Sequence, residues 1–361
     1  MKKKVLISTG GSGGHVIPAT IFYDHLKNNF DVFIFSDKRG CKFLNVEKYP
    51  VKVLNTPQLK LNILTLPFNL MKIFILIIKS LIFIKKNNID ILISTGGYMS
   101  LPLCIASKLA NIDIYLFEPN MVLGRLNNIF LKFSKKIFCY SSDIKNFPQR
   151  LLKKIELIEP MLRKEFYSIK KDKSISIKEK INLLIIGGSQ GAKLFDFILK
   201  ETTLGLSKKY QLKVFHQTNI SNYGNLKYFY NKHNITSELF DFDEDVIKYI
   251  KDANLAITRA GASTLSELTF LNIPFLAIPL PTAKDDHQYQ NALFYKNKNC
   301  CWLLKEDLLN QESLIKILQN IIENYDDYLK KKTNMKNFSY QNTWNNINQK
   351  IISVINENRI S

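Results

Sequence analysis

The sequence predicts an α/β protein with two domains, each built on a parallel sheet. The chain has 361 residues, and domains usually run to about 100–200 residues. Four segments repeat one local order, an apolar strand followed by a Gly-containing loop and a helix. They are Val5–Ala19, Asp90–Leu109, Asn182–Phe195 and Asn254–Leu268. Continuous apolar strands that alternate with helices indicate parallel sheets covered on both faces.

The order of these segments predicts two Rossmann-like domains that face each other across a cleft. The first and third segments each open a half-chain, and the junction falls near Glu159–Arg163. We expect an N-terminal domain over residues 1–158, a C-terminal domain over 164–335, and a final helix over 336–361 that packs back on the first domain. Because open parallel sheets bind ligands at the carboxyl ends of their strands, we expect the Gly-containing loops to form the site.

The composition indicates a folded and strongly basic chain. Lys and Arg total 51 against 31 Asp and Glu, a formal net charge of +20. A field of that sign attracts phosphorylated substrates, anionic lipid or nucleic acid, although a bias toward Lys and Asn gives the same excess. Hydrophobic residues make up 46% of the chain, which argues against disorder. The five cysteines form no C-x-x-C pair, which indicates a reduced, cytoplasmic chain.

The stretch Leu61–Lys86 is long and apolar, but lysines interrupt it. Lys72, Lys79 and Lys86 recur every seven residues, so they lie along one helical face and predict an amphipathic helix with a broad apolar side. Such a helix either packs on its own sheet or lies at a bilayer surface with its lysines at the headgroups.

Residues Gly10–His15 read GGSGGH and form the first strand-to-helix loop. Glycines let the backbone approach a ligand closely, and the following helix offers N–H groups to an anion. His15 stands where the loop meets the helix, and a histidine beside strand ends suits a general base. The alternative is a histidine that only caps or packs at the helix start.

Two motifs of the second half predict a nucleotide site. GGSQGA, at Gly187–Ala192, is a second Gly-rich loop between a strand and a helix, and Ser189 offers a hydroxyl to a phosphate. In RAGASTLSE, Arg259–Glu267, small residues leave room for a base or ribose, and the Glu267 carboxylate is placed to accept hydrogen bonds from ribose hydroxyls. The alternative is a capping box in which Thr264 and Glu267 satisfy backbone donors.

Two further polar stretches are candidates for contacts to a sugar or to a metal ion. KDDHQYQNA, at Lys284–Ala292, follows an apolar strand, where contacts to sugar hydroxyls are expected. DFDED, at Asp241–Asp245, contains a D-x-D of the kind that holds a divalent metal, but these acids precede a helical stretch and are expected to cap it. The five histidines have no metal-ligand spacing. We therefore expect no metal and no cofactor.

The ordered combination GGSGGH, TGGYMSLP, FEPN, GGSQGA, RAGASTLSE and DDHQYQNA closely resembles the MurG family of bacterial cell-wall enzymes, in glycosyltransferase family 28. The resemblance runs from the first strand to about Ala292. It implies a GT-B fold and metal-independent, inverting transfer of N-acetylglucosamine from UDP-N-acetylglucosamine (UDP-GlcNAc) to lipid I, which forms lipid II. The donor is expected mainly on the second domain and the acceptor on the first.

The same resemblance implies a peripheral protein at the cytoplasmic face of the inner membrane. The basic and apolar stretch Leu61–Lys86 is then expected to dock on anionic lipid. Nucleic acid is not an expected partner, whereas other cell-wall synthesis proteins are.

The resemblance also assigns site residues by position. His15 is the first candidate for the base that activates the acceptor hydroxyl. Glu118 is the second, because the family's H-E-Q-N reads Phe117–Asn120 here. The expected substrate contacts are Ser12, Gly13 and Gly14 near the phosphates, Asn120 and Arg163 on the donor, Ser189 on the diphosphate, Ala262, Ser263, Thr264, Leu265, Ser266 and Glu267 on the uridine, and Gln288 on the sugar hydroxyls.

Three other functions remain open from the sequence. One is another GT-B enzyme, either a different UDP-sugar transferase or a UDP-GlcNAc 2-epimerase. A nicotinamide-dependent oxidoreductase also has Rossmann-like halves, but neither Gly-rich loop has the G-x-G-x-x-G spacing. The third is a basic, non-enzymatic binder of lipid or nucleic acid, for which strong salt dependence is expected.

Overall fold

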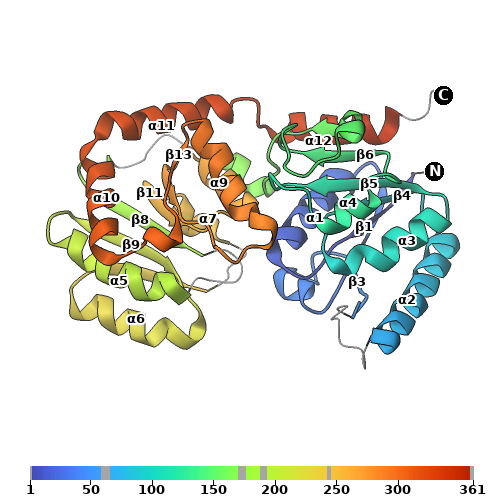
Figure 1. The fold of residues 1–361 in the computed structure, drawn as a ribbon, viewed down its shortest axis with the longest axis horizontal. Coiled ribbons are helices and arrows are strands. Elements are labelled where there is room, and N and C mark those ends of the chain that lie inside the picture. Colours follow the sequence, from blue (N-terminus) through green and yellow to red (C-terminus); the bar gives the residue numbers. More distant parts are fainter. Residues whose placement is uncertain (1, 58–65, 170–175, 188–192, 242–244, 358–361) are drawn as a thin grey trace. The chain divides into compact units, whose positions relative to one another are not determined.

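The protein is described here from a computed structural model, which covers residues 2–57, 66–169, 176–187, 193–241 and 245–357. The chain divides into two compact units, Met1–Lys164 with Thr343–Ser361, and Glu165–Asn342 (Figure 1). Each unit is described by itself.

The first unit is built on a sheet of seven parallel strands in the order β3-β2-β1-β4-β5-β6-β7. The strand order reverses between β1 and β4, which are hydrogen-bonded neighbours. Their side chains are almost wholly buried, as expected for strands covered on both faces. The strands are β1 (Lys4–Ser8), β2 (Asp31–Ser36), β3 (Val51–Val53), β4 (Ile91–Ser94), β5 (Asp113–Glu118), β6 (Lys136–Cys139) and β7 (Ile155–Leu157).

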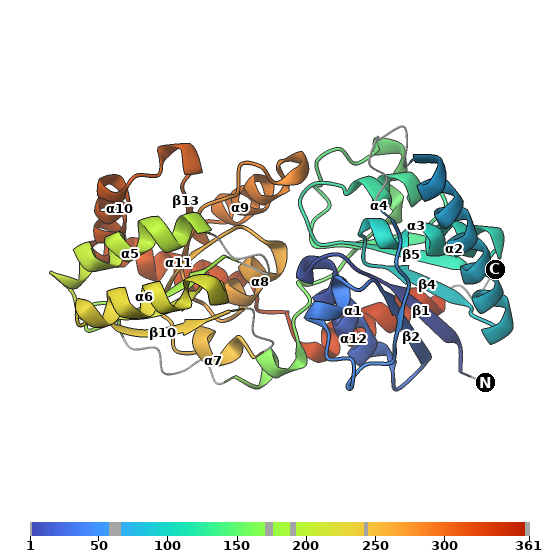
Figure 2. The same cartoon turned by 90° about the horizontal axis from the view of Figure 1, so that it is seen from below.

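Helices cover both faces of this sheet. Figure 2 shows α1 and α12 on one face and α2, α3 and α4 on the other, as right-handed crossovers from a reversed strand order require. The helices are α1 (Gly13–Leu26), α2 (Leu66–Asn87), α3 (Leu101–Leu109), α4 (Arg125–Phe130) and α12 (Trp344–Asn356). Short 3-10 turns lie at η1 (Gly40–Phe43), η2 (Tyr98–Ser100) and η3 (Gln149–Lys154).

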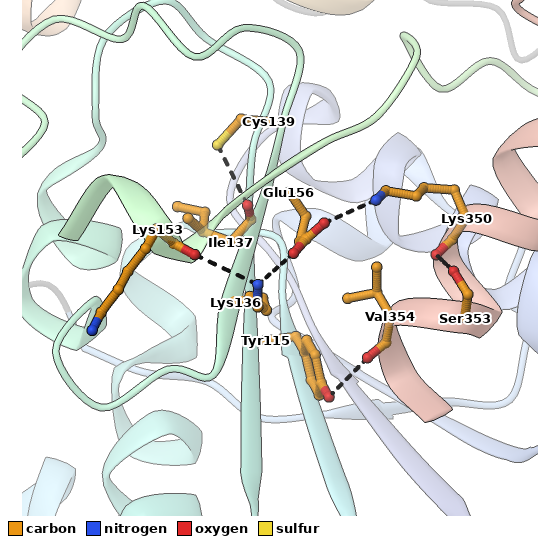
Figure 3. Close-up of polar contacts among 9 residues, drawn as sticks. All are labelled: Tyr115, Lys136, Ile137, Cys139, Lys153, Glu156, Lys350, Ser353 and Val354. Atoms are coloured by element: carbon orange, nitrogen blue, oxygen red, sulfur yellow. Dashed lines mark hydrogen bonds and ion pairs between the residues drawn. The ribbon is translucent and has the colours of Figure 1, made fainter. Parts of the chain in front are cut away.

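The last helix, α12, is held on the first unit by apolar and polar contacts. Its buried side chains are Ile347, Ile351, Val354 and Ile355. Figure 3 shows Lys350 paired with Glu156 at 2.9 Å, and the Tyr115 hydroxyl donating to the Val354 carbonyl at 3.4 Å. At the start of the helix, the Trp344 ring stacks on His25 with 3.6 Å between ring centroids. Helix α12 therefore completes the core of a domain that the chain left at Lys164.

The second unit has a six-stranded parallel sheet in the order β10-β9-β8-β11-β12-β13. The strands are β8 (Ile181–Ile186), β9 (Leu212–Gln217), β10 (Thr236–Phe240), β11 (Leu255–Thr258), β12 (Phe275–Ala277) and β13 (Cys301–Leu303). The helices are α5 (Lys193–Ser207), α6 (Ile220–Lys232), α7 (Ile247–Ile250), α8 (Ala262–Phe270), α9 (His287–Asn297), α10 (Gln311–Glu323) and α11 (Tyr325–Phe338), with short turns η4 (Lys164–Ser168), η5 (Lys284–Asp286) and η6 (Glu306–Leu308). Two parallel-sheet domains confirm the predicted α/β class.

Candidate functional site

The sequence-predicted residues of the first unit gather where the strand order reverses. His15 lies in the first turn of α1, directly after β1, and Thr95 directly follows β4. Since β1 and β4 are adjacent and parallel, both residues stand at the same edge of the sheet. A reversal of strand order opens a crevice at this edge, which is where ligands of open α/β sheets bind.

His15 is held by two hydrogen bonds to Thr95. Its ring Nδ1 lies 2.8 Å from the Thr95 carbonyl oxygen, and the Thr95 hydroxyl donates to the His15 carbonyl oxygen at 2.9 Å. A carbonyl oxygen only accepts, so Nδ1 must carry the proton. In the neutral ring the lone pair is then on Nε2, which is the atom that acts as a general base.

The loop after β4 is shaped around this ring. Gly96 and Gly97 have φ angles of +91° and +80°, which L-residues with a Cβ rarely adopt. A Cβ on Gly96 would stand 3.1 Å from Cε1 and Nδ1 of His15. The TGGYMSLP motif predicts a strand, loop and helix and contributes to the family resemblance, but no local pattern in it indicates that Thr95 and Gly96 hold the candidate base.

Asp37, which directly follows β2, holds the GGSGGH loop. Its Oδ1 accepts from the backbone N–H groups of Gly11 and Gly40, both at 2.8 Å. Burial by itself raises the pKa of Asp37, but these hydrogen bonds and Arg39 outweigh it and lower the pKa of the carboxyl below its ordinary value. A Cβ on Gly10 would stand 2.7 Å from this Oδ1, so the close approach requires glycine. No motif in the sequence indicates this supporting role of Asp37.

The loop places Ser12, Gly13 and Gly14 at the start of α1. Ser12 is the N-cap residue, but its side chain makes no capping hydrogen bond. Gly13 is buried, whereas Gly14 is exposed. The loop therefore presents a hydroxyl and the first turn of a 14-residue helix, a combination suited to phosphate oxygens.

Glu118 and Asn120 stand at the end of the next strand, β5. Glu118 is buried, and its carboxylate accepts hydrogen bonds from the backbone N–H groups of Asn120 and Gly124 and from the side-chain amides of Asn120 and Asn127. Asn120 is half-buried. Both residues therefore belong to the same edge of the first sheet as His15. Arg163, also half-buried, lies beyond β7 near the end of the first unit.

In the second unit, the RAGASTLSE motif forms the start of α8. The N-cap residue is Gly261, which has no side chain to cap the helix. A capping box would need Thr264 as the N-cap residue, just before the helix begins. Because the helix already begins at Ala262 and Thr264 lies inside it, the capping-box alternative is wrong.

The six predicted uridine contacts differ in exposure. Ala262, Ser263 and Thr264 are partly exposed in the first turn, whereas Leu265, Ser266 and Glu267 are buried. The Ser266 hydroxyl donates to the Ala262 carbonyl oxygen at 2.8 Å and also lies 3.1 Å from the Tyr295 hydroxyl, so this side chain is committed to the domain interior.

Gln288, in the first turn of α9, is oriented by the loop after β12. Its side-chain Oε1 accepts from the Leu280 backbone N–H at 2.9 Å, which directs the amide nitrogen away from that backbone. Nearby, the buried Arg259 side chain donates to the Ile278 carbonyl oxygen at 3.1 Å and pairs with Glu306. Arg259 therefore ties neighbouring strand ends together.

Parts of the predicted donor site and of the acidic DFDED stretch lie outside the described residues. Ser189 is among them, and within its motif only Gly187 is described, with its N–H donating to Gln217 Oε1 at 3.0 Å. Asp243 of the DFDED stretch is also outside. Within the described ranges, no group of three or more His, Cys, Asp or Glu side chains is arranged to hold a metal ion.

Comparison with known proteins places the chain in a family. Residues 5–139 match the glycosyltransferase family 28 N-terminal domain, and residues 182–347 match the family's C-terminal domain. A Pelagibacter ubique (strain HTCC1062) protein, named UDP-N-acetylglucosamine--N-acetylmuramyl-(pentapeptide) pyrophosphoryl-undecaprenol N-acetylglucosamine transferase, is 55% identical over 99% of this chain and 100% of its own. A Rickettsia prowazekii (strain Madrid E) protein of the same name is 31% identical over 89% of this chain and 91% of its own.

Solved structures agree in fold. The crystal structure of Acinetobacter baumannii MurG superposes with a TM-score of 0.76 at 24% identity, covering 98% of this chain and 99% of that one. A UDP-N-acetylglucosamine 2-epimerase superposes at 0.63 with 12% identity, covering 99% of this chain and 98% of that one, which shows a shared fold alone. Both family domains and near-complete alignment with the first relative lead to one conclusion: this chain belongs to glycosyltransferase family 28.

Proposed function

We propose that this chain transfers N-acetylglucosamine from UDP-GlcNAc to lipid I, the undecaprenyl-pyrophosphoryl acceptor, and so forms lipid II for peptidoglycan synthesis. The observation that carries the proposal is 55% identity along essentially the whole length of a relative with that named activity. Family membership also favours a sugar transferase over the nicotinamide-dependent oxidoreductase alternative.

The geometry at His15 supports its role as the general base in the direct, inverting displacement that the family resemblance implies. The acceptor hydroxyl attacks the anomeric carbon from the face opposite UDP, gives its proton to His15 Nε2, and the bond electrons leave with the diphosphate. The Thr95 carbonyl fixes the Nδ1–H tautomer that this step requires. A positioned general base contributes about 10²–10⁴-fold to such a rate.

The donor is assigned to the second domain. The partly exposed first turn of α8, from Ala262 to Thr264, receives the uridine, with the Glu267 carboxylate on the ribose hydroxyls. Gln288, whose Oε1 is engaged by Leu280, donates its amide N–H to a sugar hydroxyl. Ser189 and Arg163 bind the donor diphosphate, where negative charge grows as the bond breaks.

The surface of α2 supports peripheral attachment to an anionic membrane. The helix is long and apolar enough to cross a bilayer by length and composition, and only 17% of its most apolar window is buried. Its buried face is narrow, at Ile73, Ser80 and Ile84. The opposite face exposes Phe68, Leu70, Met71, Phe74, Ile75, Ile78 and Ile82. Lysines 72, 79 and 86 edge that face, an arrangement typical of a helix that lies in the headgroup region.

The test is UDP release from UDP-GlcNAc by purified protein, with and without a short-chain lipid I analogue and with excess EDTA. Release that requires the acceptor and survives EDTA is the expected result. Sugar epimerisation or release without an acceptor would point to the epimerase or another UDP-sugar enzyme, and loss of activity in EDTA would refute metal independence.

A further inference from the structure

We propose that Arg39 is a further binding residue for the acceptor: Asp37 holds its guanidinium beside the GGSGGH loop, where it pairs with the diphosphate of the acceptor. The inference rests on the proposed function, and it concerns the first unit alone. It adds a full positive charge to a loop that otherwise offers hydrogen bonds and a helix dipole.

The Asp37 carboxylate divides its two oxygens between the loop and Arg39. Oδ1 accepts from the Gly11 and Gly40 N–H groups, both at 2.8 Å. Oδ2 accepts from Arg39 Nε at 2.8 Å and lies 2.8 Å from Arg39 Nη2. Because a single carboxylate joins these donors, Arg39 Nη2 lies no more than about 8 Å from the Gly11 nitrogen. The guanidinium is therefore fixed next to the loop.

The turn that follows Arg39 packs directly on the Gly-rich loop. A Cβ on Gly40 would stand 3.0 Å from the Gly10 Cα, which is tighter than an ordinary contact, so this approach requires a glycine. The loop is open at the next residue, because a Cβ on Gly11 would meet nothing within 4 Å. An anion therefore has room at the part of the loop that Asp37 connects to Arg39.

Arg39 retains hydrogen-bond donors after it has paired with Asp37. Its side chain is 48% exposed, whereas that of Asp37 is 5% exposed. A guanidinium carries five N–H donors in a planar fork. Among the described residues, the polar contacts of Arg39 both go to Asp37 Oδ2 and leave the other donors for a ligand.

The sequence around Arg39 carries more positive charge than Asp37 balances. Lys38, Arg39 and Lys42 are exposed, and Asp37 is the only acidic residue among residues 37–46. A diphosphate diester carries two negative charges, whereas a helix N-terminus offers only about half of one positive charge. An arginine adds a full charge and binds phosphate oxygens in a bidentate geometry. The local chemistry therefore suits a diphosphate.

Kinetics with the lipid I analogue in neutral detergent test the assignment, because anionic headgroups are then absent. Arg39→Ala and Arg39→Gln both remove the charge, and the glutamine can still donate to Asp37. We expect each to raise the KM for the acceptor about 10- to 100-fold, the range for lost hydrogen bonds to a charged group. Turnover at saturating acceptor and the KM for UDP-GlcNAc should stay within about threefold, as for a residue that contributes binding alone.

A short-chain polyprenyl diphosphate, which has the diphosphate but no sugar, isolates the proposed contact. It should inhibit the wild-type enzyme competitively against the lipid I analogue. Its inhibition constant should rise in Arg39→Ala by a factor similar to that of the acceptor KM. Arg39→Lys should recover part of the loss, because lysine keeps the charge but not the planar fork.

Lys38→Ala is the matched control. It removes one positive charge from the neighbouring exposed residue, which hydrogen-bonds to Asn55 through its backbone N–H and not through its side chain. Because an exposed charge without a fixed partner contributes little, the acceptor KM should stay within about threefold. Urea unfolding of every variant separates a loss of stability from a loss of binding.

Four results would overturn the role of Arg39. Wild-type values of the acceptor KM and of the inhibition constant in Arg39→Gln would do so, even if Arg39→Ala did not fold. Equal losses in Lys38→Ala and Arg39→Ala would indicate general electrostatic attraction. Weaker binding to anionic vesicles with an unchanged acceptor KM would assign Arg39 to lipid headgroups, and a raised KM for UDP-GlcNAc alone would assign it to the donor diphosphate.

The wild-type protein separates this inference from the proposed function. If it transferred no sugar to the lipid I analogue, the proposed function itself would fail. An active wild-type enzyme with unaltered Arg39 variants would remove only the role of Arg39.

Discussion

Gly96→Ala tests whether the loop after β4 positions the catalytic base. The added Cβ would stand 3.1 Å from two atoms of the His15 ring, whereas ordinary contacts begin near 3.4 Å, so the ring must move by a few tenths of an ångström. The residue would also keep a φ angle of +91°, at a cost of about 1–3 kcal/mol. Because a misplacement of about 1 Å costs about 10²-fold, a shift of a few tenths of an ångström should lower kcat about 3- to 10-fold.

The assay combines turnover with the protonation of the ring. Nitrogen NMR of the histidines, assigned with a His15→Gln variant, should show an Nδ1–H tautomer for His15 in the wild-type protein and a mixture in Gly96→Ala. UDP affinity should not change, because the uridine site is assigned to the second unit.

Gly11→Ala is the control for backbone strain. Gly11 has a similar φ of +86°, but a Cβ there would meet nothing within 4 Å. Both variants should lose similar stability, while only Gly96→Ala alters the His15 tautomer. A Gly96→Ala enzyme with the expected loss of stability but wild-type kcat and tautomer would refute the positioning argument.

Three further predictions follow from other contacts. Burial and nearby Lys164 lower the pKa of His25 from 6.5 to about 3. The folded state therefore binds fewer protons than the unfolded state, and the free energy of unfolding falls as pH drops from about 6.5 toward 3. His25→Phe keeps an aromatic ring for the stack on Trp344, so urea titrations of this variant should show a smaller loss of stability over that pH range. Burial alone raises the pKa of Glu156, but its lysine partners outweigh burial and lower the pKa below 4.5. The difference in unfolding free energy between wild type and Glu156→Gln should therefore be largest near neutral pH and shrink as pH falls below about 4.5. Phe74→Glu, on the exposed face of α2, should weaken binding to anionic vesicles about tenfold or more without changing UDP affinity; unchanged vesicle binding would reject α2 as the membrane surface.

Local sequence was sufficient for the architecture. Strand and loop propensities act over a few residues, so the apolar runs at Val5–Ser8 and Ile181–Ile186 and the glycines that follow them identified parallel α/β domains and the loops at their strand ends. The sequence also predicted His15 and Asn120 as site residues, by their place after strands and by resemblance to a family.

Only the tertiary structure decided how those residues are held. His15 is hydrogen-bonded to Thr95, 80 positions away, and Asp37 supports Gly11 from the end of the neighbouring strand. No local pattern reports such contacts, because they depend on which strands become neighbours. The spacing of Thr264 and Glu267 is compatible with a capping box as well as with a ribose contact. Only the observed start of α8 at Ala262 excludes the capping box.

The last helix shows most clearly which features are local to the sequence and which depend on the tertiary structure. The sequence predicts a final helix over residues 336–361, whereas α12 runs from Trp344 to Asn356; the helical periodicity behind that prediction is a local property of the sequence. The position of α12 on the first unit depends on Tyr115, Glu156 and His25. These groups meet α12 only after the sheet at the beginning of the chain has formed and offers an uncovered apolar face. Burial of that face against α12 is therefore a property of the assembled fold and not of either segment alone.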